Sequence, residues 1–483
     1  MDPKLLSLAQ SYASSVYDEE IMLVSALASL PAPSHHEGKR ARFIVDWFHA
    51  NGAPEAYIDE QKNVIVPIAT RNEDGTPRDL AVFAAHTDVV FPDRDSFHPE
   101  VSGTRIEAPG IGDDTACLAG LMLAARYLIQ HPEITSHMDT GLLVVANSCE
   151  EGLGNLDGTK QVFNALGHRI HEYISFDRYM PQCCSVAVGS RRFKISCHAR
   201  GGHSWADYGT PNALERICAL VERLYALPLP EDPRTTMNVG KIEGGTTVNS
   251  IAEDASLLFE FRSTSEEVLD SLEKQLRQEV DKLQAPECTF SISIIGNRPG
   301  NGEVPEEPEA ELTQACVDVL TKIAGVRPDL SPASNDANIP LSMGIPATSV
   351  GTIIGGGAHT REEWIDATSL PKGLAVTLSL MLRHARRFRD DIGKAQRPEV
   401  EERIRKLHEH ADALKDDPEL ARRLQDLREK AEAVRSDPVA RAEIEAHIEA
   451  IRKRAEEARL SHHKDQGQAT AASAQADEPA KVR

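Results

Sequence analysis

Short apolar runs alternate with amphipathic stretches over about the first 390 residues of the chain. This alternation is typical of an α/β fold with a mainly parallel sheet. Four of the apolar runs end directly in polar or Gly-rich sequence, at residues 80–85, 142–147, 173–176 and 345–350. In an open α/β sheet the ligand crevice lies beyond the carboxyl ends of the strands. We therefore expect the polar residues that follow these four runs to converge.

A different pattern occupies residues 190–299. It predicts, in order, a strand at 191–199, a helix at 211–226, strands at 235–242 and 255–262, a helix at 265–283 and a strand at 288–295. This order is that of a ferredoxin-like α+β unit. Because α/β sequence resumes after Gly300, we predict a catalytic domain formed by residues 1–189 and 300–393, with an inserted lid domain at 190–299.

The composition changes beyond residue 396, where Glu, Arg, Ala and Leu dominate. Asp-Pro pairs at 417–418 and 437–438 are helix-start signals, since Asp caps a helix and Pro suits its first position. We predict a C-terminal helical extension at 397–463. The remaining residues, 464–483, are rich in Ala, Gln, Asp and Ser and are predicted to form a disordered tail.

Composition and charge exclude several classes of protein. Hydrophobic residues make up 41% and charged residues 27%, the balance of a globular protein. No apolar run approaches the roughly 18 residues that cross a bilayer, and the N-terminus lacks a signal peptide pattern, so we expect a cytoplasmic protein without a membrane partner. A net charge of −22 argues against nucleic acid as a partner. The eight cysteines show no CxxC pair and are expected to be reduced.

His86 is the first candidate metal ligand. It follows the run 80–85 directly, and Asp88 stands two residues further on, where its carboxylate can orient the imidazole ring. Metal-bound histidines commonly have such a partner. Taken alone, a histidine at a strand end is more often a surface or hydrogen-bonded residue.

Two pairs of acids strengthen the metal interpretation. Asp113 and Asp114 lie in a Gly-containing turn before an apolar helix, where helix capping is the alternative explanation. Glu150 and Glu151 follow the run 142–147, and two unpaired carboxylates there would repel each other unless a cation lay between them.

Asp177 and His359 complete the pattern. Asp177 follows the run 173–176, and His359 lies in a loop with three consecutive glycines, which let the backbone approach a ligand closely. Two histidines and several acids thus fall just past predicted strand ends. This mixture of ligand types suits zinc, cobalt or manganese.

In its motifs the chain resembles a known family, the dinuclear zinc exopeptidases and deacylases that include peptidase T, carboxypeptidase G and aminoacylase. The resemblance covers about residues 15–390 and looks closest to peptidase T. The matching motifs are His86-Thr87-Asp88, Gly112-Asp113-Asp114, Glu150-Glu151-Gly152, Phe176-Asp177, Gly201-Gly202-His203-Ser204, Gly244-Gly245-Thr246-Thr247-Val248-Asn249, Ser334-Asn335-Asp336-Ala337-Asn338 and Gly357-Ala358-His359-Thr360.

The resemblance implies two Zn²⁺ ions in each subunit, with Co²⁺ or Mn²⁺ as alternatives. It assigns Asp113 as the bridging ligand, His86 and Asp177 to one metal, and Glu151 and His359 to the other. It also implies that Glu150 is the general base and that Asp88 orients His86. Such a centre activates water and polarises an amide carbonyl.

The resemblance further implies a homodimer formed through the lid domain. His203 would act catalytically by reaching the partner's site and stabilising the oxyanion. Asn249 and Arg262 would bind substrate, and Arg262 could clamp a carboxylate through its guanidinium. A salt bridge at the strand end is an equal alternative for Arg262. Thr115 departs from the commonest family pattern, and the helical extension has no counterpart in it.

Three functions remain open at this point. The first is hydrolysis of amide bonds in short peptides, of the aminopeptidase or dipeptidase type. The second is removal of an acyl group from N-acyl amino acids by the same metal centre. The third is a non-catalytic metal-binding scaffold that works through the helical extension. Glu150 argues against the scaffold, because a scaffold has no use for an unligated carboxylate beside two metals.

Overall fold

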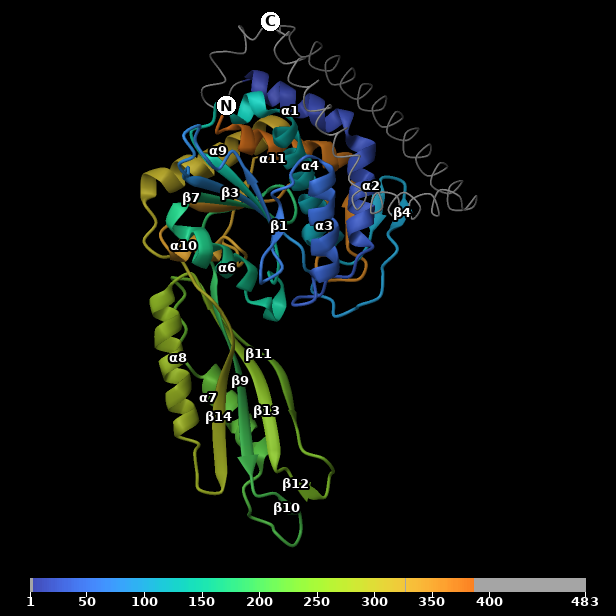
Figure 1. The fold of residues 1–483 in the computed structure, drawn as a ribbon. Coiled ribbons are helices and arrows are strands. Elements are labelled where there is room, and N and C mark those ends of the chain that lie inside the picture. Colours follow the sequence, from blue (N-terminus) through green and yellow to red (C-terminus); the bar gives the residue numbers. More distant parts are fainter. Residues whose placement is uncertain (1–2, 326, 386–483) are drawn as a thin grey trace, which may run out of the picture. The chain divides into compact units, whose positions relative to one another are not determined.

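The computed structural model describes residues 3–325 and 327–385 (Figure 1). The predicted extension at 397–463 and tail at 464–483 lie outside the described residues. Within these limits, one compact unit comprises residues 3–98, 108–325, 327–365 and 369–385. Residues 99–107 belong to a second unit and form a hairpin of β4 (Glu100–Ser102) and β5 (Arg105–Glu107). No described helix has both the length and the apolar character needed to span a membrane.

The first unit contains an eight-stranded sheet with the order β1-β2-β6-β3-β7-β16-β8-β15. The four apolar runs singled out above form its contiguous, mutually parallel centre, as predicted. These strands are β6 (Gly141–Asn147), β3 (Leu80–His86), β7 (Ile170–Phe176) and β16 (Ala347–Val350). The flanking strands are β1 (Tyr57–Ile58), β2 (Val64–Ile68), β8 (Gln182–Cys184) and β15 (Asp329–Leu330). The predicted α/β class is confirmed, and the carboxyl ends of the central strands share one edge.

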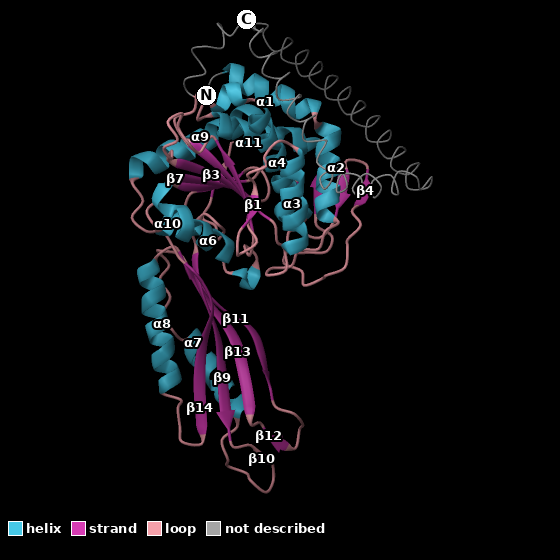
Figure 2. Ribbon diagram, in the orientation of Figure 1, coloured by secondary structure: helices cyan, strands magenta, loops and turns pink. Residues whose placement is uncertain are grey.

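Both faces of the central strands are covered by helices (Figure 2). All seven residues of β3 are buried, which is typical of a strand in a parallel sheet between helical layers. Leu80, Val82 and Ala84 share a core cluster with residues of α6 and α10. α11 packs against α1, α4 and α9. The helices are α1 (Pro3–Ser15), α2 (Tyr17–Ala28), α3 (Gly38–Ala50), α4 (Ala116–Gln130), α5 (Pro132–Thr135), α6 (Asp157–Leu166), α9 (Glu306–Ala324), α10 (Asn338–Ser342) and α11 (Leu370–Leu382).

The inserted segment has the six predicted elements in the predicted order. They are β9 (Gly189–Ala199), α7 (Ala213–Tyr225), β11 (Thr235–Gly244), β13 (Asp254–Ser263), α8 (Glu266–Asp281) and β14 (Cys288–Arg298), with short strands β10 (Gly202–His203) and β12 (Ser250–Ile251). The sheet is antiparallel with the order β11-β13-β9-β14. Its apolar face packs on both helices and gives this segment a hydrophobic core of its own. The ferredoxin-like prediction is therefore confirmed.

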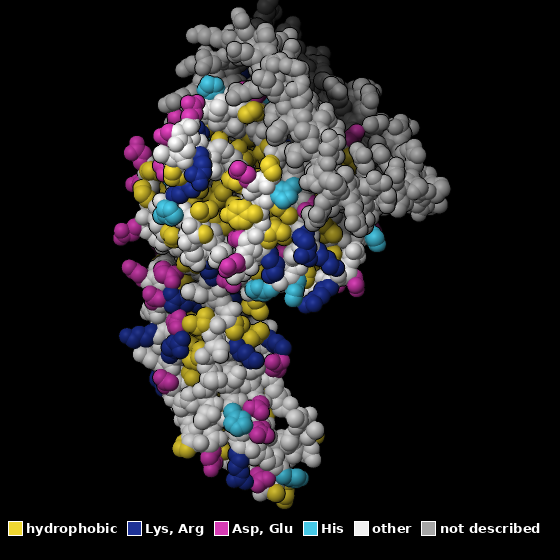
Figure 3. All heavy atoms as spheres, viewed as in Figure 1, with side chains coloured by type: hydrophobic (Ala, Val, Ile, Leu, Met, Phe, Trp, Pro, Cys, Tyr) yellow, Lys and Arg dark blue, Asp and Glu magenta, His cyan; other side chains and the backbone are white. Residues whose placement is uncertain are grey.

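The surface of the inserted segment is polar and of mixed charge. On the face shown in Figure 3, its acidic and basic side chains are interspersed rather than gathered into a basic stripe. Such a pattern is typical of a solvated protein surface.

Candidate metal centre

Four of the five predicted metal ligands lie in direct contact at the carboxyl edge of the sheet. His86 Nε2 is 3.0 Å from Asp113 Oδ1. His359 Nε2 is 3.3 Å from Asp113 Oδ2 and 3.3 Å from Glu151 Oε1. Ligand atoms of His86, Asp113 and Glu151 all lie within 4.8 Å of one another, close enough to share a cation.

Asp177, the fifth predicted ligand, joins the group from the end of β7. Its side chain is buried, and its Oδ1 accepts no hydrogen bond. The neighbouring Arg178 places its Nε 3.9 Å from Asp177 Oδ1 and 3.1 Å from Asp113 Oδ2. The five residues therefore converge from five separate segments of the chain.

The pKa values of these groups are shifted, because several ionisable side chains lie close together in a buried site. Burial raises the pKa of Glu151 to about 7, although His359 opposes the shift. Burial and the charge of Asp113 raise the pKa of Asp177 to about 6. Burial also disfavours charge on Asp113, but hydrogen bonds from His359 and His86 outweigh it and lower the pKa of Asp113. Hydrogen bonds to Asp113 and Glu151 raise the pKa of His359 to about 10.

This donor set fits divalent cations. The carboxylates of Asp113, Glu151 and Asp177 are all buried, and Asp177 Oδ1 has no hydrogen bond. Buried carboxylates are stable when paired with cations or coordinated to metals. Imidazole and carboxylate together are the ligands of zinc, cobalt and manganese sites.

Asp88 has a wider role than the predicted orientation of His86. Its Oδ1 accepts from Glu150 N and its Oδ2 from Glu151 N, both at 2.9 Å, and Ser34 Oγ donates to Oδ2 at 2.7 Å. His86 Nδ1 lies 3.0 Å from the backbone oxygen of Asp88 and 3.5 Å from its Oδ1. The carboxylate therefore mainly holds the backbone of the glutamate pair, while the carbonyl orients the ring.

Glu363 holds the backbone of the loop that carries Asp113. Its carboxylate accepts from the backbone nitrogens of Gly110, Gly112 and Asp113, and from the hydroxyl of Tyr179. A Cβ at Gly112 would lie 2.5 Å from the Tyr179 ring, so this close approach requires glycine.

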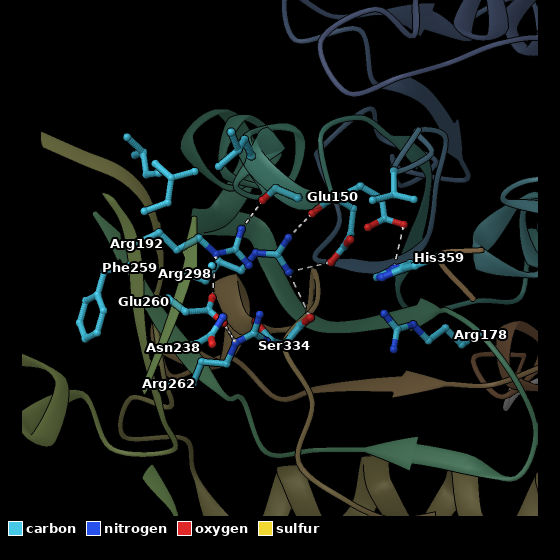
Figure 4. A pocket seen from close by; sticks show the side chains of 17 residues that line it. Glu150, Arg178, Arg192, Asn238, Phe259, Glu260, Arg262, Arg298, Ser334 and His359 are labelled. Carbon is cyan, nitrogen blue, oxygen red and sulfur yellow. Dashed lines mark hydrogen bonds and ion pairs between the residues drawn. The ribbon is translucent and has the colours of Figure 1, made fainter. Parts of the chain in front are cut away.

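A cavity of about 360 Å³ opens beside this cluster (Figure 4). The predicted ligands Glu151 and His359 line it together with Glu150, while the inserted segment contributes both polar and apolar side chains. Besides the three already named, the lining residues are Val90, Gly152, Leu153, Arg178, Arg192, Asn238, Gly240, Leu258, Phe259, Glu260, Arg262, Ile295, Arg298 and Ser334.

Arg262 lines this cavity, and it forms the salt bridge that was the alternative to a substrate contact. Its Nε donates to Glu260 Oε1 at 2.9 Å, and Arg192 Nε is 3.4 Å from Glu260 Oε2. Two guanidinium groups thus share one carboxylate, which leaves one positive charge in excess.

His203 and Asn249 do not line this cavity in their own chain. Both are exposed residues at or next to the short β10–β12 pair. His203 Nδ1 accepts from Trp205 N at 3.2 Å, and Trp205 is 87% exposed.

Sequence reasoning missed four residues that contact the predicted ligands and base: Arg178, Ser34, Glu363 and Arg298. Arg178 directly follows a predicted ligand, which is a usable signal. The other three lie far from their partners in sequence, and nothing in their local pattern distinguishes them from ordinary surface residues.

Comparison with known proteins finds one matching family and related sequences. The pattern that describes Peptidase family M20/M25/M40 matches residues 82–383. A succinyl-diaminopimelate desuccinylase of Nitrosomonas europaea is 28% identical over 278 residues, which are 53% of this chain and 70% of the relative.

Solved structures show the same fold. Aminopeptidase PepT from Bacillus cereus aligns with a TM-score of 0.59 and 18% identity, covering 76% of this chain and 99% of that one. A dinuclear metal-binding peptidase from Bacillus subtilis aligns with a TM-score of 0.51 and 14% identity, over 76% and 98% of the two chains.

Proposed function

The chain belongs to peptidase family M20/M25/M40, and we propose that it hydrolyses amide bonds in short peptides with two divalent metal ions. The observation that carries the proposal is the convergence of His86, Asp113, Glu151 and His359 beside a cavity that also contains Glu150. The neighbouring folds of an aminopeptidase and of a dinuclear metal-binding peptidase support it.

We assign the metal ligands by the family resemblance, with Asp113 shared, His86 and Asp177 on one ion, and Glu151 and His359 on the other. When bound, such ions acidify a water and polarise the scissile carbonyl. Zn²⁺ is the proposed ion, with Co²⁺ or Mn²⁺ as alternatives.

Glu150 is the proposed general base. Its carboxylate is buried and lines the cavity next to the ligand Glu151, without belonging to the group of atoms that could share a cation. It would accept a proton from the attacking water and pass it to the leaving nitrogen. Asp88 keeps the backbone of Glu150 in place through the 2.9 Å hydrogen bond.

The excess positive charge around Glu260 suits a substrate that carries a carboxylate. Arg262 is 39% exposed at its side chain and can present a free edge of its guanidinium to that group. A peptide C-terminus and an N-acyl amino acid both supply a carboxylate.

Deacylation of N-acyl amino acids is therefore a second candidate, and two observations favour it. One is the likeness to a succinyl-diaminopimelate desuccinylase. The other is that each carboxylate lining the cavity contacts a basic side chain, namely Glu150 with Arg298, Glu151 with His359, and Glu260 with two arginines. Among the described residues the cavity thus offers no uncommitted acid for a free amino group.

The experiment that tests the proposal measures bound metal together with hydrolysis of Leu-Gly-Gly and of a panel of N-acetyl and N-succinyl amino acids. We expect about two metal ions per chain and hydrolysis that a chelator removes and Zn²⁺ restores. Cleavage of only the acylated substrates would select the deacylase. Metal binding without any turnover would support the scaffold, and absence of bound metal after zinc addition would refute all three functions.

Glu150→Gln is the decisive variant. We expect it to retain both metals and to lose hydrolysis by roughly 10²-fold or more, because it removes the proton acceptor without removing a ligand. Glu55→Gln, at an exposed position, is the matched control and should behave as wild type. Near-normal turnover of Glu150→Gln would refute the assignment of the base.

A further inference from the structure

Arg298, the last residue of β14, contacts the proposed base from the inserted segment. Its Nη1 donates to Glu150 Oε1 at 3.1 Å and to the carbonyl oxygen of Ser334 at 3.1 Å. Its Nη2 donates to the carbonyl oxygen of Glu150. Figure 4 shows the guanidinium between these groups. One side chain therefore holds both the carboxylate and the backbone of a single residue.

The ion pair is enclosed by protein. Arg298 is 4% exposed and Glu150 is 5% exposed. Removing both charges from water is expensive, so a buried pair adds little net stability and is better explained by the geometry that it specifies. The planar guanidinium suits that purpose, because its donors lie in a rigid fork.

The backbone that carries Arg298 is itself fixed. The side chain of Asn338, at the start of α10, donates from Nδ2 to the carbonyl oxygen of Pro299 at 2.8 Å and to that of Val188 at 2.9 Å. Val188 and Pro299 flank β9 and β14, where the chain enters and leaves the inserted segment. The side-chain amide of Asn338 thus connects the backbone at the two ends of the inserted segment. Because Pro299 follows Arg298 directly, this fixes the backbone next to Arg298.

We propose that Arg298 is a positioning residue. It holds Glu150 Oε1, so that Oε2 is the oxygen atom that accepts the proton from water. This rests on the proposed function, in which Glu150 is the general base. Arg262 serves a different purpose, because its partly exposed side chain faces the cavity and contacts Glu260 instead of Glu150. The two arginines should therefore differ in which kinetic parameter they control.

The test compares Arg298→Gln, Arg298→Lys and wild type as zinc-loaded full-length chains. Arg298→Gln should lower kcat about 100-fold, with KM changed less than about threefold and metal content unchanged, because substrate and metal contacts remain. Arg298→Lys should recover part of kcat, since an ammonium restores the charge but not the fork. Arg223→Gln removes an exposed arginine of α7 that pairs with Glu279, and it should leave both parameters unchanged.

Several outcomes overturn the proposal. An unchanged kcat in Arg298→Gln would show that the base needs no such support, and a raised KM with normal kcat would make Arg298 a substrate contact. Crystal structures of zinc-loaded wild type and Arg298→Gln give a readout independent of activity. We expect the Glu150 carboxylate to change position, and an unmoved carboxylate overturns the proposal even if kcat falls. Failure of wild type to hydrolyse any amide would instead refute the proposed function, while the crystal comparison would still decide the role of Arg298.

Discussion

Glu150 and Glu151 are adjacent in sequence but have different surroundings. Asp88 accepts hydrogen bonds from both backbone nitrogens, which fixes the pair as one unit. The Glu151 carboxylate contacts His359, whereas the Glu150 carboxylate forms an ion pair with Arg298. Residue type and spacing predicted a functional role for both acids. Their different partners, which come from elsewhere in the chain, support the division into ligand and base.

Glu20 provides a prediction about pH and stability away from the metal centre. It is 1% exposed in α2, and its Oε2 has no hydrogen-bond partner. Burial raises the pKa of its carboxyl to about 8. The folded protein therefore binds a proton here that the unfolded chain releases above its ordinary pKa of about 4.5, so the free energy of unfolding falls as pH rises from 4.5 to 8.

Glu20→Gln removes this titration and keeps the shape of the side chain. We expect the variant to exceed wild type in stability at pH 8, on the order of 3 kcal/mol, with a much smaller gain at pH 5. Thermal unfolding midpoints at the two pH values measure the effect, with Glu55→Gln as the exposed control. An equal gain at both pH values would contradict the burial of an ionising carboxyl.

The helices and strands divide into those that local pattern predicts and those that depend on packing. β3, β6, β7 and β16 were predicted from their apolar runs, because a strand buried on both faces has a continuous hydrophobic signal. The antiparallel pairing of β2 with β6, and of β8 with β16, was not predicted. β2 and β8 are short strands next to the edge strands β1 and β15, and such short strands have little periodicity. Their direction is decided by the connections that precede them.

Asn338 links β9 and β14 to α10, and it supports a prediction at these junctions. It is fully buried, and besides its two donated hydrogen bonds its Oδ1 accepts from Asn335 N at 2.9 Å. Asn338→Ala removes the hydrogen-bond partner of one buried backbone nitrogen and of two partly buried carbonyl oxygens. We expect a loss of roughly 3 kcal/mol or more in stability, and faster proteolysis near Val188 and Pro299.

Thermal unfolding and limited proteolysis test the role of Asn338. The matched control is Asn297→Ala, because Asn297 is an exposed asparagine in β14 close to the same junction. Cleavage at other sites, with the two junctions still protected, would show that Asn338 is not what holds them.

For the molecule as a whole, the positions of His203 and Asn249 bear on the predicted homodimer. Neither lines the cavity of its own chain, and exposed apolar side chains lie close to them in sequence, with Trp205 87%, Tyr208 91% and Val248 101% exposed. Such surface is expected where another protein surface docks. We therefore retain the proposal that a partner subunit supplies His203 to the active site.

Mixing two inactive variants tests this trans arrangement. His203→Ala alone should lose most turnover with its metals intact, and Glu150→Gln should be inactive. In mixed dimers the His203→Ala subunit receives His203 from its partner, so random reassociation of equal amounts should recover about a quarter of wild-type activity, since half of the dimers have one intact site.

Sedimentation verifies the oligomeric state of the same samples. A strictly monomeric active enzyme, or full activity of His203→Ala alone, would exclude the trans role. Absence of recovery in dimers shown to be mixed would exclude it as well.

The sequence by itself determined the central strands, the inserted ferredoxin-like segment and the set of histidines and acids beyond the strand ends. These features are local, since they depend on periodicity and on the residues that directly follow each strand. Only the tertiary structure decided what holds those residues. Arg298 is 148 positions from Glu150, and Glu363 is 250 positions from Asp113, and each contact depends on how whole elements pack. Hydrophobic pattern specifies which segments become buried, but the partners of a buried charge are specified by the fold that encloses it.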